Sequence, residues 1–256
     1  SILADMKKQY LILLATLFIP FLASAQETFR GEKHPTTFSE LDQYFYEVEV
    51  YQFDAESLAE AARSSDELIF QLEMGDRHRW GLRIVPNDMR AENYKLRAMT
   101  ENGVVEYPRS PLRTFKGYHK DFENDVRLTL DENFLYGYVE NGDTRWFMEP
   151  LRTFIKDQPE DLFILYKEQD VVPYEGNFCA ANEIHQRNPL SDEEVENARA
   201  LNDCWEVELA IASDYLMFVE YNMSIDQVEA QTEGVMNNVQ GNYDDDFADQ
   251  IFFNIV

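Results

Sequence analysis

Two cysteines carry the most distinctive chemistry in this sequence. Cys179 and Cys204 are about 25 positions apart. A thiolate is a strong zinc ligand. In an oxidising compartment the two thiols could instead form a disulfide, and closing a loop of about 25 residues contributes about 3 kcal/mol of stability. His185 follows Cys179 at a spacing too loose to predict a metal-binding pair, so we expect an ordinary linker histidine there.

A group of carboxylates lies near the C-terminal end of the sequence. It consists of Asp244, Asp245, Asp246 and Asp249. Clustered carboxylates attract calcium, but this run lacks the glycine and the twelfth-position glutamate of an EF-hand loop. We therefore expect a solvent-exposed turn, with calcium binding as the alternative.

Most of the chain is predicted to form β-strands. Residues 26–173 alternate apolar and polar side chains with a period of two, which is typical of half-buried strands. Polar turns separate the runs at residues 75–78, 101–103, 131–133 and 140–143. A short helix is expected over residues 54–62, with Asp54 as its N-cap. The pattern predicts one antiparallel β domain.

A different pattern begins after residue 203. Residues 205–211 predict a largely apolar strand, a short helix starts at residues 213–214, and Ser224 with Gln227 caps a longer helix. The apolar stripe of this longer helix is predicted to be Ile225, Val228, Val235, Met236 and Val239. Because residues 251–256 begin another strand, we expect the strand-helix-helix-strand opening of an α/β domain, truncated before its remaining elements.

The N-terminal residues predict a secretory signal peptide. Lys7 and Lys8 form a basic region, residues 10–22 are mostly apolar but too short to span a bilayer comfortably, and residues 23–25 read Ala-Ser-Ala. We expect cleavage before Gln26, secretion of the chain and no membrane attachment afterwards. Residues 1–5 are interpreted as upstream read-through.

Composition excludes some classes of partner. The 256 residues carry a formal net charge of −27, which disfavours binding to nucleic acid phosphates and anionic lipid surfaces. With 45% hydrophobic and 14% aromatic residues the chain has ample material for a packed core.

Several stretches together resemble a known family. Residues 207–215 read VELAIASDY, residues 235–247 read VMNNVQGNYDDDF and residues 251–256 read IFFNIV. In this order they are similar to the start of the catalytic domain of adamalysin or reprolysin-type zinc metalloproteases. Residues 115–154, with a Gly turn, VRLTL, LYGYV and MEPL in succession, resemble the core of that family's propeptide.

The resemblance implies a zinc enzyme, but its metal-binding motif is missing here. Such enzymes hold zinc through His-Glu-x-x-His-x-x-Gly-x-x-His, in which the glutamate acts as general base. The four histidines of this chain are followed by Pro35, Arg79, Lys120 and Gln186, so no His-Glu pair exists. We therefore expect the parent protein to be a zinc metalloendopeptidase and this chain alone to be inactive.

Two residues acquire candidate roles from the resemblance. Cys179 matches a cysteine switch, whose thiolate occupies the zinc position that catalytic water needs, although Ala180 stands where the family usually has glycine. A disulfide with Cys204 and an inert thiol remain the alternatives. Glu208 matches a glutamate that helps to hold a structural calcium in some members, and a partly solvated edge position is the alternative.

These observations predict an α+β chain with four parts. They are a signal peptide (1–25), an antiparallel β-rich propeptide domain (26–190), a linker (191–203) and the start of a zincin-like catalytic domain (204–256). The propeptide is expected to assist folding and to keep the protease latent. Its partners would be its own catalytic domain, an activating protease and, for the parent, protein substrates. The alternatives are a secreted acidic β-rich binding module and a free-standing metalloprotease inhibitor.

Overall fold

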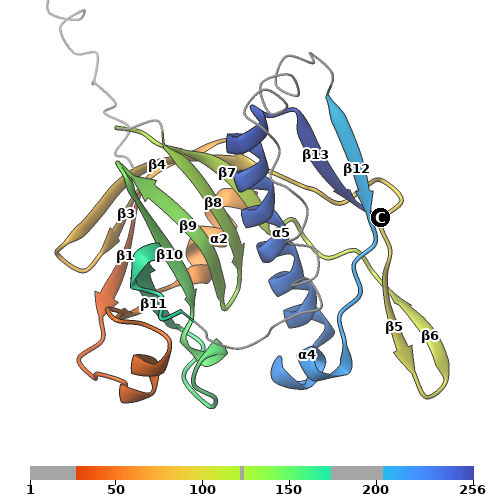
Figure 1. The fold of residues 1–256 in the computed structure, drawn as a ribbon, viewed down its shortest axis with the longest axis horizontal. Coiled ribbons are helices and arrows are strands. Elements are labelled where there is room, and N and C mark those ends of the chain that lie inside the picture. The colour runs from red at the N-terminus through yellow and green to blue at the C-terminus, as the bar shows by residue number, and fades with distance from the viewer. Residues whose placement is uncertain (1–26, 122–123, 174–203) are drawn as a thin grey trace, which may run out of the picture.

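The computed structural model describes residues 27–121, 124–173 and 204–256. The expected signal peptide, Cys179, His185 and the linker lie outside these residues. The described residues form an α+β structure in which a β-barrel is followed by a C-terminal unit of two strands and two helices (Figure 1).

Within the described residues, nine strands close into a barrel in the order β1-β2-β11-β10-β9-β8-β7-β4-β3. Their bounds are β1 Glu27–Lys33, β2 Glu49–Gln52, β3 Leu68–Met74, β4 His78–Pro86, β7 Thr114–His119, β8 Asp125–Asp131, β9 Phe134–Asn141, β10 Thr144–Pro150 and β11 Leu162–Lys167. Closure depends on a parallel pairing of β1 with β3, whereas the other neighbours in the barrel pair antiparallel. The predicted antiparallel domain is therefore wrong at this seam, because a closed ring of nine strands, an odd number, cannot be antiparallel at every pairing.

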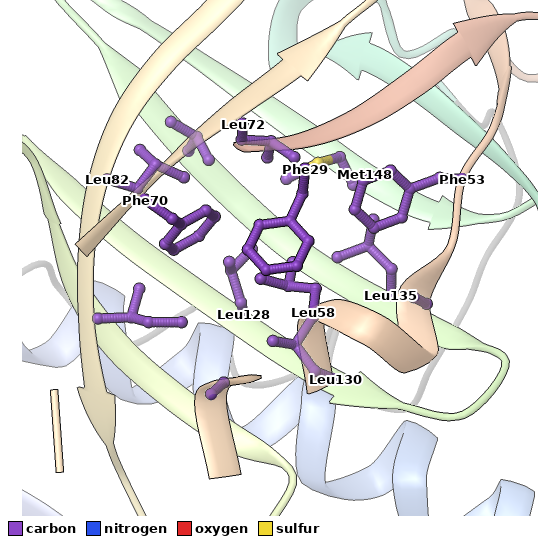
Figure 2. Close-up of a cluster of buried hydrophobic side chains, with 14 of the residues drawn as sticks. Phe29, Phe53, Leu58, Phe70, Leu72, Leu82, Leu128, Leu130, Leu135 and Met148 are labelled. Atoms are coloured by element: carbon purple, nitrogen blue, oxygen red, sulfur yellow. The ribbon is translucent and has the colours of Figure 1, made fainter. Parts of the chain in front are cut away.

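The barrel core contains a short helix. Helix α2 (Ala55–Arg63) begins at Asp54, whose carboxylate accepts a hydrogen bond from Ser57 N at 3.0 Å, as predicted. Its buried Leu58 lies among inward-facing strand residues such as Phe70 and Leu128 (Figure 2). Alternate strand residues face this cluster, which leaves the outward residues of β8 and β9 available to other elements.

Smaller elements lie between or after the barrel strands. Three 3-10 turns, η1 (Ser39–Gln43), η2 (Leu151–Thr153) and η3 (Glu168–Asp170), lie in the described connections. The predicted hairpin at Asn102-Gly103 is confirmed as β5 (Leu96–Thr100) and β6 (Gly103–Tyr107), which project away from the barrel (Figure 1).

The C-terminal unit has the predicted strand-helix-helix-strand order. It consists of β12 (Trp205–Leu209), α4 (Tyr215–Glu220), α5 (Ile225–Phe247) and β13 (Ile251–Ile255). Strands β12 and β13 pair in parallel, as expected for strands joined by a helical crossover. The predicted cap of α5 is confirmed, because Ser224 Oγ accepts a hydrogen bond from Gln227 N at 3.2 Å.

The C-terminal unit lies on the outside of the barrel. Helix α5 runs along β7, β8 and β9, and Ile255 at the end of β13 exchanges backbone hydrogen bonds with Met89 and Ala91 (Figure 1). Among the described residues, no helix is both long and apolar enough to cross a membrane.

Candidate functional site: the α5 interface

The surface between the barrel and helix α5, called the α5 interface below, has an unusual composition. The buried residues of α5 are small or polar: Glu229, Ala230, Gln231, Glu233, Gly234, Asn237, Gln240, Gly241 and Asp244. The predicted apolar stripe is wrong as the buried face, since none of its five members is buried and Val235 is 40% exposed. The helix turns its polar side inward because the barrel presents arginines and tyrosines to it.

Two glycines of α5, Gly234 and Gly241, allow the helix to pack closely on strand β9. A Cβ built on Gly234 would lie 2.7 Å from Tyr136 Cδ1, and one on Gly241 would overlap Tyr138 Oη. The glycines are two helical turns apart and therefore share one face. The aromatic rings of β9 occupy the space that side chains at these two positions would need.

Asn237 ties the helix to the barrel backbone between these glycines. Its Nδ2 donates to Phe115 O at 3.1 Å and to Leu128 O at 3.3 Å, and its Oδ1 accepts from Asn87 Nδ2 at 2.8 Å. Phe115 and Leu128 are register partners on β7 and β8. A fully buried amide with three partners fixes both the rotation and the position of α5 along the barrel.

Arg127 forms the main ion pair at the C-terminal half of α5. Its Nη2 lies 2.7 Å from Asp244 Oδ2 and its Nε 2.9 Å from Asp125 Oδ2. Asp125 also accepts from Tyr138 Oη at 2.5 Å. Burial opposes the charge of Arg127, but Asp125 and Asp244 outweigh it and raise the pKa of the guanidinium. Removing one partner would leave a buried charge uncompensated.

Arg145 forms a second set of contacts with the C-terminal half of α5, closer to solvent than Arg127. It donates to Asn242 Oδ1 at 2.7 Å and to Glu140 Oε1 at 2.9 Å, and it stacks 4.3 Å from the centre of the Tyr138 ring. Asp245 lies 3.5 Å from its Nη2. The Arg145–Asp245 pair is more exposed than the Arg127–Asp244 pair and is expected to contribute less to stability.

A second charged cluster lies at the N-terminal half of α5. Arg113, just before β7, contacts Asp226 and Asp131 and lies 3.1 Å from Glu229 Oε2. Glu229 Oε1 accepts from Tyr94 Oη at 2.8 Å. Burial opposes the charge of Arg113, and the surrounding carboxylates overcome this and raise its pKa.

A largely buried carboxyl on β10 lies near the residue that follows helix α4. Glu149 on β10 accepts a hydrogen bond from Tyr166 of β11 and lies near Tyr136 and Tyr221, the latter directly after α4. Burial raises the pKa of Glu149 to about 7, opposed only in part by the bond from Tyr166. This group is therefore partly protonated near neutral pH.

Of the predicted metal-binding residues, Cys179 lies outside the part of the chain that the structure describes. Glu208 is exposed on β12, opposite Asn254 in register, and its calcium role stays a prediction. The described residues contain no group of three or more His, Cys, Asp or Glu side chains able to hold a metal ion.

Asp244 departs from its predicted place. Asp244, Asp245 and Asp246 all lie inside α5 and not in a turn, so the predicted turn is wrong for these three. Asp244 is buried against Arg127, whereas Asp245, Asp246 and Asp249 are exposed. Burial of Asp244 needs an arginine that lies more than a hundred residues away in the sequence. Cys204 is exposed and lines a groove of about 410 Å³ with Trp205, Lys116 and Phe252.

The arginines of this interface were missed by sequence reasoning. Arg90, Arg113, Arg127 and Arg145 lie on or beside different strands and share no motif. One local signal was available in α5 itself, where Gly234 and Gly241 stand seven residues apart with an asparagine between them. Comparison with known proteins finds no matching family model and no matching curated relative.

Proposed function

We propose that this chain is the N-terminal part of a secreted zinc metalloendopeptidase precursor, in which the barrel is the prodomain and residues 204–256 begin the catalytic domain. The α5 interface carries the proposal. A helix of the proposed catalytic unit buries its polar side on the barrel and leaves Val235 outward. The barrel would thereby hold an early part of the catalytic unit and assist its folding.

The chemistry of the α5 interface suits two parts that must later separate. Interfaces that stay together permanently are more hydrophobic, whereas those between parts that move apart are more polar. Arg127 and Asp244 can be rehydrated when the helix leaves the barrel. An apolar surface released in the same way would promote aggregation.

Apolar side chains on the outer side of the C-terminal unit support the same proposal. Trp205 is 59% exposed, and Leu216 and Met223 are also exposed. Large apolar side chains that are exposed on one unit can be covered by other polypeptide. In the proposal, the remainder of the catalytic domain covers them and supplies the zinc ligands.

The test starts from the gene. The proposal expects the three-histidine zinc motif in the coding sequence that follows Val256. It also expects a longer product that cleaves peptides only after proteolysis within the linker, residues 191–203. A zinc chelator should abolish that activity. Absence of the motif would overturn the proposal and favour a secreted acidic binding module.

Matched cysteine variants of the longer product would test latency. If Cys179 is a zinc-binding switch, Cys179→Ser should raise the activity of the uncut precursor and Cys204→Ser should not. If the two cysteines form a disulfide, both substitutions should lower stability by similar amounts.

A further inference from the structure

The N-terminal half of the α5 interface holds a cluster of arginines and carboxylates. The arginines there are Arg63, Arg90, Arg109 and Arg113. The carboxylates are Asp88, Asp131, Asp226, Glu229 and Glu233. Asp226 is 66% exposed, so solvent screens its charge, whereas Glu233 is 5% exposed and a charge without hydrogen bonds there is strongly unfavourable.

Glu233 is the carboxylate without a hydrogen bond. Its side chain is 5% exposed, and neither carboxylate oxygen has a hydrogen-bond partner among the described residues. Arg90 Nη1 lies 3.3 Å from Glu233 Oε1 but donates to Ser110 O at 3.0 Å and to Ser110 Oγ at 2.8 Å.

The other donors near Glu233 are also engaged. Arg90 Nε and Nη2 donate to Asp88 at 2.7 and 3.1 Å. Arg113 donates to Asp131, Asp226 and Glu229. Tyr94 also lies near Glu233, but its hydroxyl donates to Glu229. A charge on Glu233 would therefore lack the hydrogen bonds that stabilise a buried carboxylate.

We propose that docking of α5 on the barrel takes up a proton at Glu233, so that mild acid holds the C-terminal unit on the barrel and a rise above neutral pH loosens it. The proton neutralises the buried Glu233 carboxylate when the helix is docked. When the helix leaves, Glu233 meets water and releases the proton.

The electrostatics of the site agree with this geometry. Burial raises the pKa of Glu233 to about 7, with Arg90 opposing the rise and Glu229 adding to it. The folded pKa lies above the ordinary value, so the stabilisation is fully present below about pH 4.5 and is lost as the pH rises through 7. The proton linkage rests on the interface alone, and its use as a release signal rests on the proposed function.

The test compares the wild-type chain with Glu233→Gln. Unfolding in urea is measured at pH 5.5 and at pH 8. A shift of the pKa from about 4.5 to about 7 raises the unfolding constant by about thirtyfold between these pH values. We expect Glu233→Gln to remove this thirtyfold part and to be more stable than the wild type at pH 8. Other groups, such as Glu149, titrate equally in both proteins and cancel.

The matched control is Asp246→Asn, an exposed carboxylate on the same helix, which should leave the pH dependence unchanged. The proposal is overturned if Glu233→Gln destabilises the chain at pH 8, as the loss of an ordinary ion pair would, or leaves the pH dependence intact. If the variant does not fold, carbon-13 NMR titration of Glu233 in the wild type decides. A midpoint near 7 supports the proposal and one near 4.5 refutes it. Neither measurement depends on peptidase activity, so failure here leaves the proposed function standing.

Discussion

Replacing Gly241 with alanine has two physical effects of known size, and they change the stability in opposite directions. In an exposed helix, alanine is favoured over glycine by about 1 kcal/mol, because glycine loses more backbone freedom on folding. In this structure the added Cβ would overlap Tyr138 Oη and lie 3.0 Å from Asp125 Oδ2. Helix propensity alone therefore predicts that Gly241→Ala raises the free energy of unfolding, whereas docking on the barrel predicts that it lowers this free energy.

The magnitude follows from what must move. Overpacking a closed interface costs about 1–3 kcal/mol. Displacing Tyr138 would also weaken its 2.5 Å hydrogen bond to Asp125, and a bond to a charged group contributes about 1.5–3 kcal/mol. After the gain in helix propensity is subtracted, we expect Gly241→Ala to lower the free energy of unfolding by about 2 kcal/mol.

Urea unfolding with linear extrapolation measures this change. The control is Val235→Ala on the exposed side of α5, which should alter stability by no more than about 0.5 kcal/mol. Tyr138→Phe removes the hydroxyl that meets the new Cβ, so the double variant should lose at least about 1 kcal/mol less than the two single losses combined. A stabilisation of about 1 kcal/mol by Gly241→Ala would refute docking of α5 at Tyr138.

Three further predictions concern the same chain. Arg127→Met should lower the free energy of unfolding by about 3–5 kcal/mol, because Asp125 and Asp244 stay buried without their partner. Adding Asp244→Asn should recover part of this loss. Equal losses in the single and the double variant would contradict the ion pair. Glu149→Gln should stabilise the chain by about 2–3 kcal/mol at pH 8 and little at pH 5, because burial raises the pKa of Glu149 to about 7 and its stabilisation is lost as the pH rises through that value. A gain in stability that does not depend on pH would argue against this. Thiol titration of the native, zinc-free chain should find Cys179 and Cys204 both reactive if Cys179 is a switch, and neither reactive if they form a disulfide.

The sequence determined the local structure of this protein. The period of two predicted the strands, Asn102-Gly103 predicted a hairpin, and Asp54 and Ser224 marked the helix starts that the structure confirms. Each of these signals acts over a few residues, because caps, turns and side-chain alternation depend on neighbours in the chain.

Tertiary structure decided how the elements meet. The parallel pairing of β1 with β3 and the inward rotation of the polar side of α5 both depend on partners far apart in the sequence. An apolar stripe predicts burial only when the opposing surface is apolar, and here the barrel presents Arg127 and Tyr138 instead. The same helix could lie on a different surface with its other side buried. Its orientation therefore follows from the shape and charge of the barrel and not from its own pattern.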